Sequence, residues 1–506
     1  MRSILCFTAG FAAFAQLGLF ASPARSAERT GARAEVDAAA ADAAAQTIAV
    51  DFDRVTKSGV KPGAAGLNLC WLLDSDLRRP HTPSVAQALA DMKVGVLRFP
   101  YGHLADNYLW HTPPYDDVRG GLRPKVATMA DNPGKWEWAV RPDGSFKASM
   151  DFDEYLDLCA KLGIKPLVCV NALSWKYPGG PSYETLKAAA VAWVKYDRTK
   201  PDRVAYWQIG NEVDHHRDLL PVDGYAALYR DFAAAMKAVD STIKIGPGIL
   251  QQPEYYERVL QTAPGLVDFI SVHQYMHGQV KACPDYAGWR DARSTFTFGV
   301  ERAVKVLATA GQPKMEILVT ETGVSGPASL GIVNNTYKAL WWFETLMNEL
   351  AQPQVSYTFY WGTHSPWNYH GEDLEPRGDV AVALRLRDNT RTPTGEIIRL
   401  VNDHLLDSFV AVDRVAGLVR AYALRSTDGH RVVLGLLNKS ETAQDVTVQW
   451  RGFSAGAVRR ATEFAGRNPA DVQPTTRPKT ETPVAADRLA TALAPLSLTY
   501  FELAAR

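Results

Sequence analysis

Two glutamates directly follow apolar segments that are typical of buried strands. Glu212 comes after the segment 205–209 and the dipeptide Gly210-Asn211, and Glu321 comes after the segment 317–319. The carboxyl ends of the parallel strands of a barrel meet at one face, where catalytic groups gather. Two opposed carboxylates can cut a glycosidic bond, because one protonates the leaving oxygen while the other attacks or activates water. The pair therefore predicts a glycoside hydrolase, with two separate rim salt bridges as the alternative.

The two carboxylates would need different protonation states. If Glu212 is the acid, we expect its pKa to be raised by burial or by the charge of its neighbour. Glu321 should stay ionised through hydrogen bonds and a nearby cation. Arg98, in the run Leu97-Arg98-Phe99-Pro100, is the expected cation because it also ends an apolar segment.

Other polar residues fit structural roles better. His215 and His216 follow Glu212, but adjacent histidines point in different directions and have no ligand partner at i+4, so we expect loop histidines near the substrate rather than a metal site. Asp151 and Asp153 are expected to cap a helix. We predict neither a metal nor a cofactor.

The elements around these residues alternate between short apolar runs and amphipathic stretches. This alternation is typical of a parallel α/β fold, and eight such units predict a closed (β/α)₈ TIM barrel. The segment 101–150 would form a large loop after the second strand. The eight predicted strands are 64–69, 94–99, 166–170, 204–209, 243–246, 269–272, 317–319 and 356–360.

The pattern changes near residue 401, where short strands separated by turn residues predict an antiparallel β-sandwich. An early strand-like stretch, 46–52, could belong to the barrel or join this sandwich. We expect the sandwich to be a packing partner, with carbohydrate binding as the alternative. The predicted organisation is a signal peptide over 1–27, an Ala-rich linker over 28–46, the barrel over 47–400 and the sandwich over 401–506.

The amino-terminal segment has the features of a secretory signal. Arg2 precedes a nearly apolar run over 4–20, and small residues follow at 21–27. An uncleaved membrane anchor is the alternative, although the run is short for a span. We therefore expect an exported protein, periplasmic or extracellular, with no membrane attachment after cleavage.

Charge and cysteine content exclude several classes of protein. Lys plus Arg and Asp plus Glu both total 55, so the formal net charge is zero, and no basic block stands out. This argues against nucleic acid or an anionic membrane as the main partner. The four cysteines beyond the signal have no CxxC spacing and are expected to be free buried thiols, with one disulfide as the alternative in an oxidising compartment.

Several motifs resemble a known family. The run Trp207-Gln208-Ile209-Gly210-Asn211-Glu212 resembles the acid/base motif of clan A glycoside hydrolases, especially the α-L-arabinofuranosidases of family 51. The runs Leu97-Arg98-Phe99-Pro100-Tyr101-Gly102, Asp151-Phe152-Asp153-Glu154-Tyr155 and Ile270-Ser271-Val272-His273-Gln274-Tyr275 are similar to other segments of that family. The resemblance covers the barrel and extends loosely into the sandwich.

The resemblance implies a role for each residue of the candidate site. Glu212 would be the general acid/base and Glu321 the nucleophile, with the two carboxyl groups about 5 Å apart because clan A enzymes retain configuration. Asn211 would bind the hydroxyl next to the anomeric carbon. The remaining substrate-binding residues would be Arg98, Asn171, His273, Tyr275 and Trp361.

The resemblance leaves the substrate open. Family 51 usually has an acidic residue before the nucleophile and a Trp soon after it, whereas this chain has Thr320-Glu321-Thr322-Gly323. Families 39, 79 and 30 share the same barrel and the same two glutamates. Release of α-L-arabinofuranose from polysaccharide or oligosaccharide is the expected activity. The alternatives are a neighbouring xylosidase, glucanase or glucuronidase, or a non-catalytic barrel that binds polysaccharide.

Overall fold

The computed structural model describes residues 46–111, 149–177, 180–275, 285–324, 334–364, 369–370, 375–376, 382–413, 415–480 and 483–506. The predicted signal peptide, and the linker except for its last residue, lie outside this described part. Within it, none of the helices combines the length and the apolar character that a membrane span requires.

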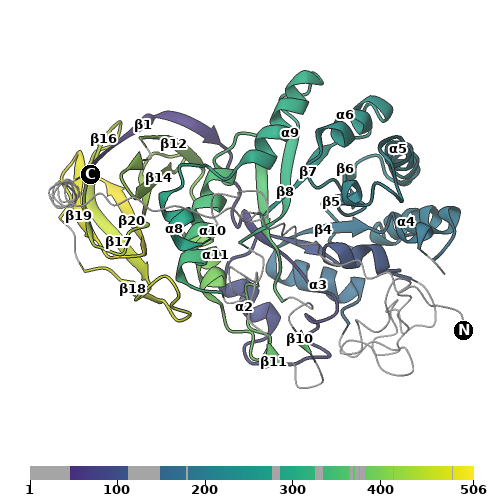
Figure 1. The fold of residues 1–506 in the computed structure, drawn as a ribbon, viewed down its shortest axis with the longest axis horizontal. Coiled ribbons are helices and arrows are strands. Elements are labelled where there is room, and N and C mark those ends of the chain that lie inside the picture. The colour runs from purple at the N-terminus through teal and green to yellow at the C-terminus, as the bar shows by residue number, and fades with distance from the viewer. Residues whose placement is uncertain are drawn as a thin grey trace, which may run out of the picture. The chain divides into compact units, whose positions relative to one another are not determined.

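The first half is the predicted (β/α)₈ barrel (Figure 1). All eight predicted strands are present, and their order around the barrel is β6-β5-β4-β3-β2-β9-β8-β7. The gap between β6 and β7 is bridged by single hydrogen bonds, such as Asp268 N to Ile245 O at 2.8 Å. The strands are β2 (Ala65–Asn68), β3 (Val96–Phe99), β4 (Lys165–Val170), β5 (Tyr206–Ile209), β6 (Lys244–Pro247), β7 (Phe269–Tyr275), β8 (Glu316–Gly323) and β9 (Val355–Tyr360).

The strands are buried on both faces, which is why they were recognisable as apolar runs. Amphipathic helices cover the outside of the barrel. Asp151 caps one of them as predicted, because its side chain accepts a hydrogen bond from Glu154 N at 2.7 Å. The helices are α2 (Val85–Asp91), α3 (Phe152–Leu162), α4 (Tyr183–Asp197), α5 (Val222–Val239), α6 (Pro253–Thr262), α8 (Tyr286–Asp291), α9 (Phe298–Thr309), α10 (Thr336–Leu350) and α11 (Pro393–His404).

The second half is a sheet that folds over its own apolar core. Its strand order is β18-β17-β20-β15-β14-β12-β1-β16-β19, with β13 beside β14. Inward side chains such as Ile48, Val448 and Leu434 share one buried cluster. The strands are β12 (Ser408–Val412), β13 (Val415–Ala416), β14 (Val419–Arg425), β15 (Arg431–Asn438), β16 (Gln444–Arg451), β17 (Ala455–Ala465), β18 (Thr475–Pro478), β19 (Arg488–Leu493) and β20 (Ser497–Ala505).

The first strand, β1 (Gln46–Ser58), belongs to this sandwich sheet rather than to the barrel. It pairs antiparallel with β12, with Val50 opposite Val412. It also pairs in parallel with β16, with Asp51 opposite Arg451. The sandwich is therefore antiparallel except at this one pair, and it needs strands from both ends of the described chain.

Helix α10 joins the two halves, since every one of its residues is buried. Figure 1 shows α10 and α11 between the barrel and the sandwich. On the sandwich side, Glu344 Oε1 accepts from Arg420 Nε at 3.1 Å, while its Oε2 accepts from Lys439 Nζ at 3.0 Å and from Trp289 Nε1 at 2.8 Å. The sandwich therefore packs directly on the barrel.

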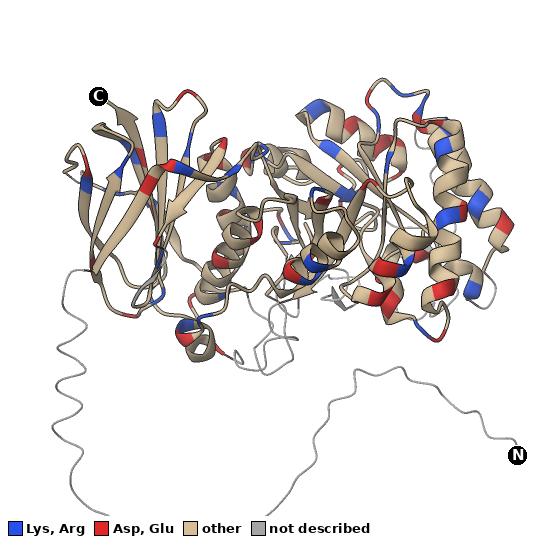
Figure 2. Cartoon of the chain, turned by 90° about the horizontal axis from the view of Figure 1, so that it is seen from above, with Lys and Arg blue, Asp and Glu red and all other residues tan. Residues whose placement is uncertain are grey.

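Charge is mixed over the molecule and the described cysteines are buried. Figure 2 shows Lys and Arg interspersed with Asp and Glu on the outer helices and on the sandwich strands. Cys70, Cys159 and Cys169 are free, as predicted. Cys283 lies outside the described residues.

Candidate active site

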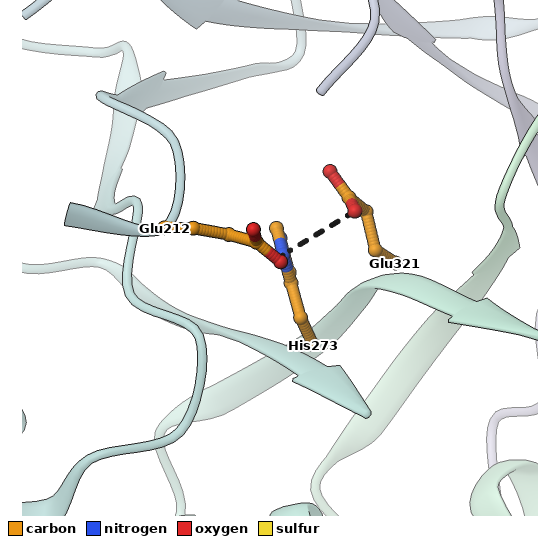
Figure 3. Close-up of side chains that lie close together, drawn as sticks. All are labelled: Glu212, His273 and Glu321. Carbon is orange, nitrogen blue, oxygen red and sulfur yellow. Dashed lines mark hydrogen bonds and ion pairs between the residues drawn. The ribbon is translucent and has the colours of Figure 1, made fainter. Parts of the chain in front are cut away.

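The polar residues that follow the barrel strands meet at one face. Arg98 comes from the end of β3, Glu212 from the loop after β5, His273 and Tyr275 from β7, and Glu321 from β8. In Figure 3 Glu212 and Glu321 approach from opposite sides, and the imidazole of His273 lies between them. Parallel strands bring their carboxyl ends to the same edge, so residues far apart in sequence become neighbours.

Glu321 is held by two donors. Arg98 Nη1 donates to its Oε1 at 2.8 Å, and Tyr275 OH donates to its Oε2 at 2.9 Å. Its side chain is only 3% exposed. Burial raises the pKa of the Tyr275 phenol well above its ordinary value, so this group keeps its proton and remains a donor. Both carboxylate oxygens of Glu321 are therefore fixed in place.

The Arg98 guanidinium organises the centre of the site. Besides Glu321, it donates to Asn68 Oδ1 and to Asn211 Oδ1, both at 2.7 Å. Its Nη2 also lies 3.8 Å from Cys169 Sγ. Because Arg98 is fully buried, these acceptors compensate a charge that water cannot reach. The predicted cation is thus in contact with the predicted nucleophile.

Glu212 lies in a strained loop that hydrogen bonds to the Asp214 carboxylate hold in place. Its φ is 46° and its ψ is 41°, which is the left-handed region that side chains other than glycine rarely adopt. Gly210 before it also has a positive φ, of 80°. The Asp214 carboxylate fixes the loop by accepting from Leu250 N at 2.7 Å and from Gln252 N at 3.1 Å. Such strain persists at functional sites when the surroundings hold it in place.

The protonation state of Glu212 differs from our expectation. Burial by itself would raise the pKa of Glu212, but hydrogen bonds from His215 and His273 outweigh burial and hold the pKa far below the usual carboxyl range. His273 Nδ1 lies 2.8 Å from Glu212 Oε1, and His215 Nδ1 lies 3.4 Å from Oε2. The same carboxylate raises the pKa of His215. The predicted upward shift is therefore wrong, because two imidazoles stabilise the ionised form.

The two carboxylates are close together. One oxygen of each, and a ring nitrogen of His273, all lie within 4.8 Å of one another. Glu212 remains 19% exposed at its side chain, while Glu321 is almost closed off. The pair therefore has one carboxylate that solvent or a leaving group can reach and one that is buried behind it.

By distance, the same three side chains could hold a metal ion. Their oxygens already accept hydrogen bonds from Arg98, Tyr275 and His273. A guanidinium in direct contact with Glu321 also disfavours a second cation beside it. The arrangement therefore fits acid–base and nucleophilic chemistry better than metal binding.

Aromatic residues form a wall beside Glu321. Trp361 packs against Tyr101 with ring centroids 4.4 Å apart and against Tyr275 at 6.2 Å. Gly102 brings the backbone close, since a Cβ there would lie 2.2 Å from Glu321 Oε1 and 2.8 Å from the Trp361 ring. Any larger residue at position 102 would displace the Glu321 carboxylate.

Asn171 lies outside this hydrogen-bonded group. Its Nδ2 donates to Asp106 O at 2.9 Å, and its Oδ1 accepts from Ser174 N at 3.2 Å. The amide therefore ties together the loops after β3 and β4. Sequence reasoning grouped Asn171 with the sugar-binding residues because it follows a strand, but these contacts support the loops.

Two residues near the carboxylates were weighed too lightly from sequence. His215 was expected only to be near the substrate, yet it is paired with Glu212. Its i, i+3 spacing from Glu212 was the available signal. Gly102 belongs to one of the motifs, but nothing in the local sequence indicates that the Glu321 carboxylate lies against it.

Comparisons with known proteins agree with these motifs. No protein-family model matches the chain. The intracellular exo-α-(1→5)-L-arabinofuranosidase of Acetivibrio thermocellus is 22% identical over 261 residues, which make up 47% of this chain and 47% of that protein. The chain thus spans about half the length of the curated relatives it matches.

Solved structures share the fold over nearly the whole chain. A family 51 α-L-arabinofuranosidase from Bifidobacterium longum has a TM-score of 0.69 and 15% identity, and covers 90% of this chain and 99% of its own. A bifunctional glucanase-xylanase from a metagenome library has a TM-score of 0.64 and 15% identity, with 91% and 99% covered. At these identities the likeness is one of fold. The chain is therefore similar, in partial sequence and in fold, to the family 51 α-L-arabinofuranosidases among the clan A glycoside hydrolases, as its motifs predicted.

Proposed function

We propose that this protein is a retaining glycoside hydrolase that releases α-L-arabinofuranose from polysaccharide or oligosaccharide. One observation carries the proposal: carboxylate oxygens of Glu212 and Glu321 lie within 4.8 Å of each other at the mouth of the barrel. Retaining enzymes hold their carboxyl groups about 5–5.5 Å apart, and inverting enzymes about 6.5–9.5 Å. The short separation leaves no room for a water between Glu321 and the sugar, which favours direct attack.

Reaction would proceed by double displacement. Glu321 attacks the anomeric carbon and forms a glycosyl ester, while the leaving oxygen takes a proton from Glu212. In the second step Glu212 accepts a proton from water, the water oxygen attacks the anomeric carbon, and Glu321 leaves. Arg98 and Tyr275 hold the Glu321 carboxylate in position throughout.

Glu212 needs a proton before it can act as the acid. The imidazoles of His215 and His273 hold its pKa low, and His215 beside it has a raised pKa. A sugar that covers Glu212 removes the remaining solvent and disfavours its charged form. The proton then moves from His215 to Glu212, which leaves a neutral imidazole and a neutral acid.

The sugar would bind between Asn211 and the aromatic wall. Asn211 Oδ1 accepts from Arg98, which directs the NH₂ group of this side chain to the hydroxyl next to the anomeric carbon. The faces of Trp361 and Tyr275 suit the apolar C–H face of a sugar ring. Arabinofuranose is favoured because curated relatives that match the chain are arabinofuranosidases.

The first test is hydrolysis of an aryl-glycoside panel by wild type, Glu321→Ala and Glu212→Ala. The panel contains α-L-arabinofuranoside, β-xyloside, β-glucoside and β-glucuronide. We expect wild type to turn over the arabinofuranoside. Both mutants should lose activity on substrates with poor leaving groups. Proton NMR should show that the sugar released first has the same anomeric configuration as the substrate. A highly activated leaving group should restore the first step in Glu212→Ala but not in Glu321→Ala. Equal activity of wild type and Glu321→Ala would refute the proposal.

A second candidate is a β-glycosidase or endo-glycanase of a neighbouring family. Thr320 occupies the place before the nucleophile where family 51 usually has an acidic residue. A glucanase-xylanase also shares the fold. Turnover of xylan or glucan without any action on the arabinofuranoside would favour this candidate. If wild type binds polysaccharide but cleaves no substrate, a non-catalytic barrel becomes the better description.

We also propose that the protein is exported. The proposal rests on Arg2 and the apolar run after it. The relative from Acetivibrio thermocellus, by contrast, is named as intracellular. Expression of the full chain in a bacterial host, followed by fractionation and amino-terminal sequencing, tests it. A mature protein outside the cytoplasm that begins near residue 25 or 28 is expected, and an uncut cytoplasmic chain would contradict export.

A further inference from the structure

A buried carboxyl group lies directly behind the candidate active site. Glu349, in the last turn of α10, is fully buried. Its Oε1 accepts a hydrogen bond from Gln274 Nε2 and another from Thr322 Oγ1 at 3.4 Å. Gln274 belongs to β7 and Thr322 to β8, so one side chain of α10 contacts both strands.

The two contacted residues alternate with the candidate catalytic residues. Gln274 lies between His273 and Tyr275, and Thr322 follows Glu321. Gln274 and Thr322 are register partners, as are His273 and Glu321. Successive side chains of a strand point to opposite faces. The barrel interior therefore receives the catalytic groups, and the outer face presents their neighbours to Glu349.

Gln274 also fixes this strand to the start of α9. Its Nε2 donates to Phe296 O at 2.7 Å, and its Oε1 accepts from Gly299 N at 2.9 Å. A Cβ at position 299 would lie 2.8 Å from that Oε1, so the close approach requires glycine. The Gln274 amide is thus fully committed, and its orientation is unambiguous.

The hydrogen-bond partners of the Glu349 carboxyl are neutral, and the buried ammonium of Lys57 donates instead to the backbone carbonyl of Leu350, the next residue. Burial raises the pKa of the Glu349 carboxyl to about 8, although hydrogen bonds with Gln274, Thr358 and Thr322 oppose the shift. These three partners come from β7, β9 and β8, and none of them is charged. The charged groups near Glu344 contact α10 five positions earlier, on its sandwich side. Glu349 therefore carries a proton at neutral pH.

We propose that Glu349 is a positioning residue that, as a neutral acid, locks β7 to β8 and so keeps His273 and Tyr275 in register with Glu321. The inference rests on the proposed hydrolase function. If the lock loosens, the distances from Glu321 to Tyr275 and to His273 become variable. A displacement of about 1 Å at such a centre can cost about 100-fold in rate.

Two substitutions at this position separate hydrogen bonding from charge. Glu349→Gln keeps an acceptor for Gln274 and Thr322 and a donor like the protonated acid, but it cannot ionise. Glu349→Leu keeps the approximate volume and loses both. We expect kcat of Glu349→Leu to fall about 10- to 100-fold with KM changed much less, and Glu349→Gln to recover most of that loss. Exposed Glu301 on α9 supplies the matched control, Glu301→Gln, with unchanged kcat.

A second readout needs no substrate. A carboxyl whose pKa is raised by folding stabilises the protein below the unfolded pKa, and this contribution is lost as pH rises through the folded pKa of about 8. The Tm of wild type should therefore fall between pH 5 and pH 8 more than the Tm of Glu349→Gln. This comparison remains informative if Glu349→Leu does not fold.

The outcomes are separable. A folded Glu349→Leu with wild-type kcat overturns the positioning role, and identical pH dependence of Tm in wild type and Glu349→Gln overturns the neutral acid. A wild type that cleaves none of the glycosides, but shows the expected difference in Tm, would instead contradict the proposed hydrolase. If Glu349→Leu lowers kcat more in the wild-type protein than in a Thr322→Val background, the two residues act through the same contact.

Discussion

Two buried carboxylate centres of this molecule use similar side chains in opposite proportions. At the barrel mouth, two carboxylates lie beside one permanent cation: Glu321 pairs with Arg98, while Glu212 pairs with the imidazoles of His215 and His273. Between α10 and the sandwich, one carboxylate, Glu344, meets two cations. In the first centre one carboxylate is held by imidazoles and is open to solvent, whereas in the second the carboxylate is held by permanent cations and is closed.

The difference teaches what makes a buried carboxylate reactive. Arg420 and Lys439 satisfy Glu344 from both sides, and Trp289 adds a third donor. Nothing is left for a substrate to displace, so the centre holds two parts of the molecule together. At the mouth, by contrast, Glu212 is accessible to solvent and its partners are imidazoles, which can exchange a proton with it. Burial alone does not distinguish the two centres, but the kind of partner does.

The largest difference between the two centres is expected for substitution of Glu321. Glu321→Gln keeps the size of the side chain and removes the nucleophile. We expect kcat to fall by about 10⁴-fold or more, which is at least as large as the greatest losses seen when a general acid is removed. Steady-state rates on the preferred aryl glycoside measure this loss, with circular dichroism as a check on folding. Residual activity within tenfold of wild type would show that the centre is not catalytic.

Glu212→Gln should have the next largest effect, and one that depends on the leaving group. With a poor leaving group, we expect a loss of about 10²–10⁴-fold because general acid assistance is gone. With an activated aryl leaving group, the rate at which the glycosyl-enzyme forms should be nearly the same in Glu212→Gln as in wild type. A loss that is independent of the leaving group's pKa would contradict the assignment of the acid.

Glu344→Gln should show the opposite behaviour. It leaves Arg420 and Lys439 buried without their counter-ion, which is expected to cost about 3–5 kcal/mol in the free energy of unfolding. Activity per folded molecule should stay within a few-fold of wild type. Urea titration monitored by fluorescence measures the stability. A stable but inactive Glu344→Gln would contradict the view that Glu344 supports stability rather than activity.

His215→Gln tests whether His215 holds the proton that Glu212 later donates. In wild type the Glu212–His215 pair holds one proton, and the raised pKa of His215 governs its loss. Without His215, the proton must reside on a carboxyl with a lower pKa. The alkaline limb of kcat/KM should therefore move to lower pH, with little change in the maximum rate. An unchanged limb would exclude His215 from proton storage.

The smallest effect is expected from chelation. Since Arg98, Tyr275 and His273 already occupy the carboxylate oxygens, EDTA should change the rate less than twofold. Added Zn²⁺ tests the converse, because Glu212, His273 and Glu321 are close enough to bind it. Activation by the metal, rather than inhibition or no effect, would place the mouth in a different class of site.

Much of this arrangement could be predicted because it depends on local pattern. Strands buried on both faces, such as β5, are short apolar runs, and residues that follow them must gather at one end of a barrel. That logic brought Arg98, Glu212 and Glu321 together from the sequence. It also brought in Asn171, because position after a strand does not reveal that a side chain is used by neighbouring loops.

What escaped prediction depends on partners distant in the sequence or on geometry. The low pKa of Glu212 arises partly from His273, which reaches it from another strand. The place of β1 was left open because its alternating burial fits the edge of either sheet, and its partners lie near residues 410 and 450. Glu349 carries no signal in the sequence, since an acidic residue near a helix end is usually solvated.

The pairing of β1 has a consequence for biosynthesis. Asp51 on β1 lies opposite Arg451 on β16, so the two are separated by 400 residues of chain. Ribosomes add about 5–20 residues per second, which leaves β1 without this partner for roughly 20–80 s while the barrel is made. During that interval β1, an amphipathic strand with unpaired edges, is open to chaperones, to translocation machinery and to other nascent chains. The sandwich can therefore be completed only after β16 and the strands that follow it have been synthesised.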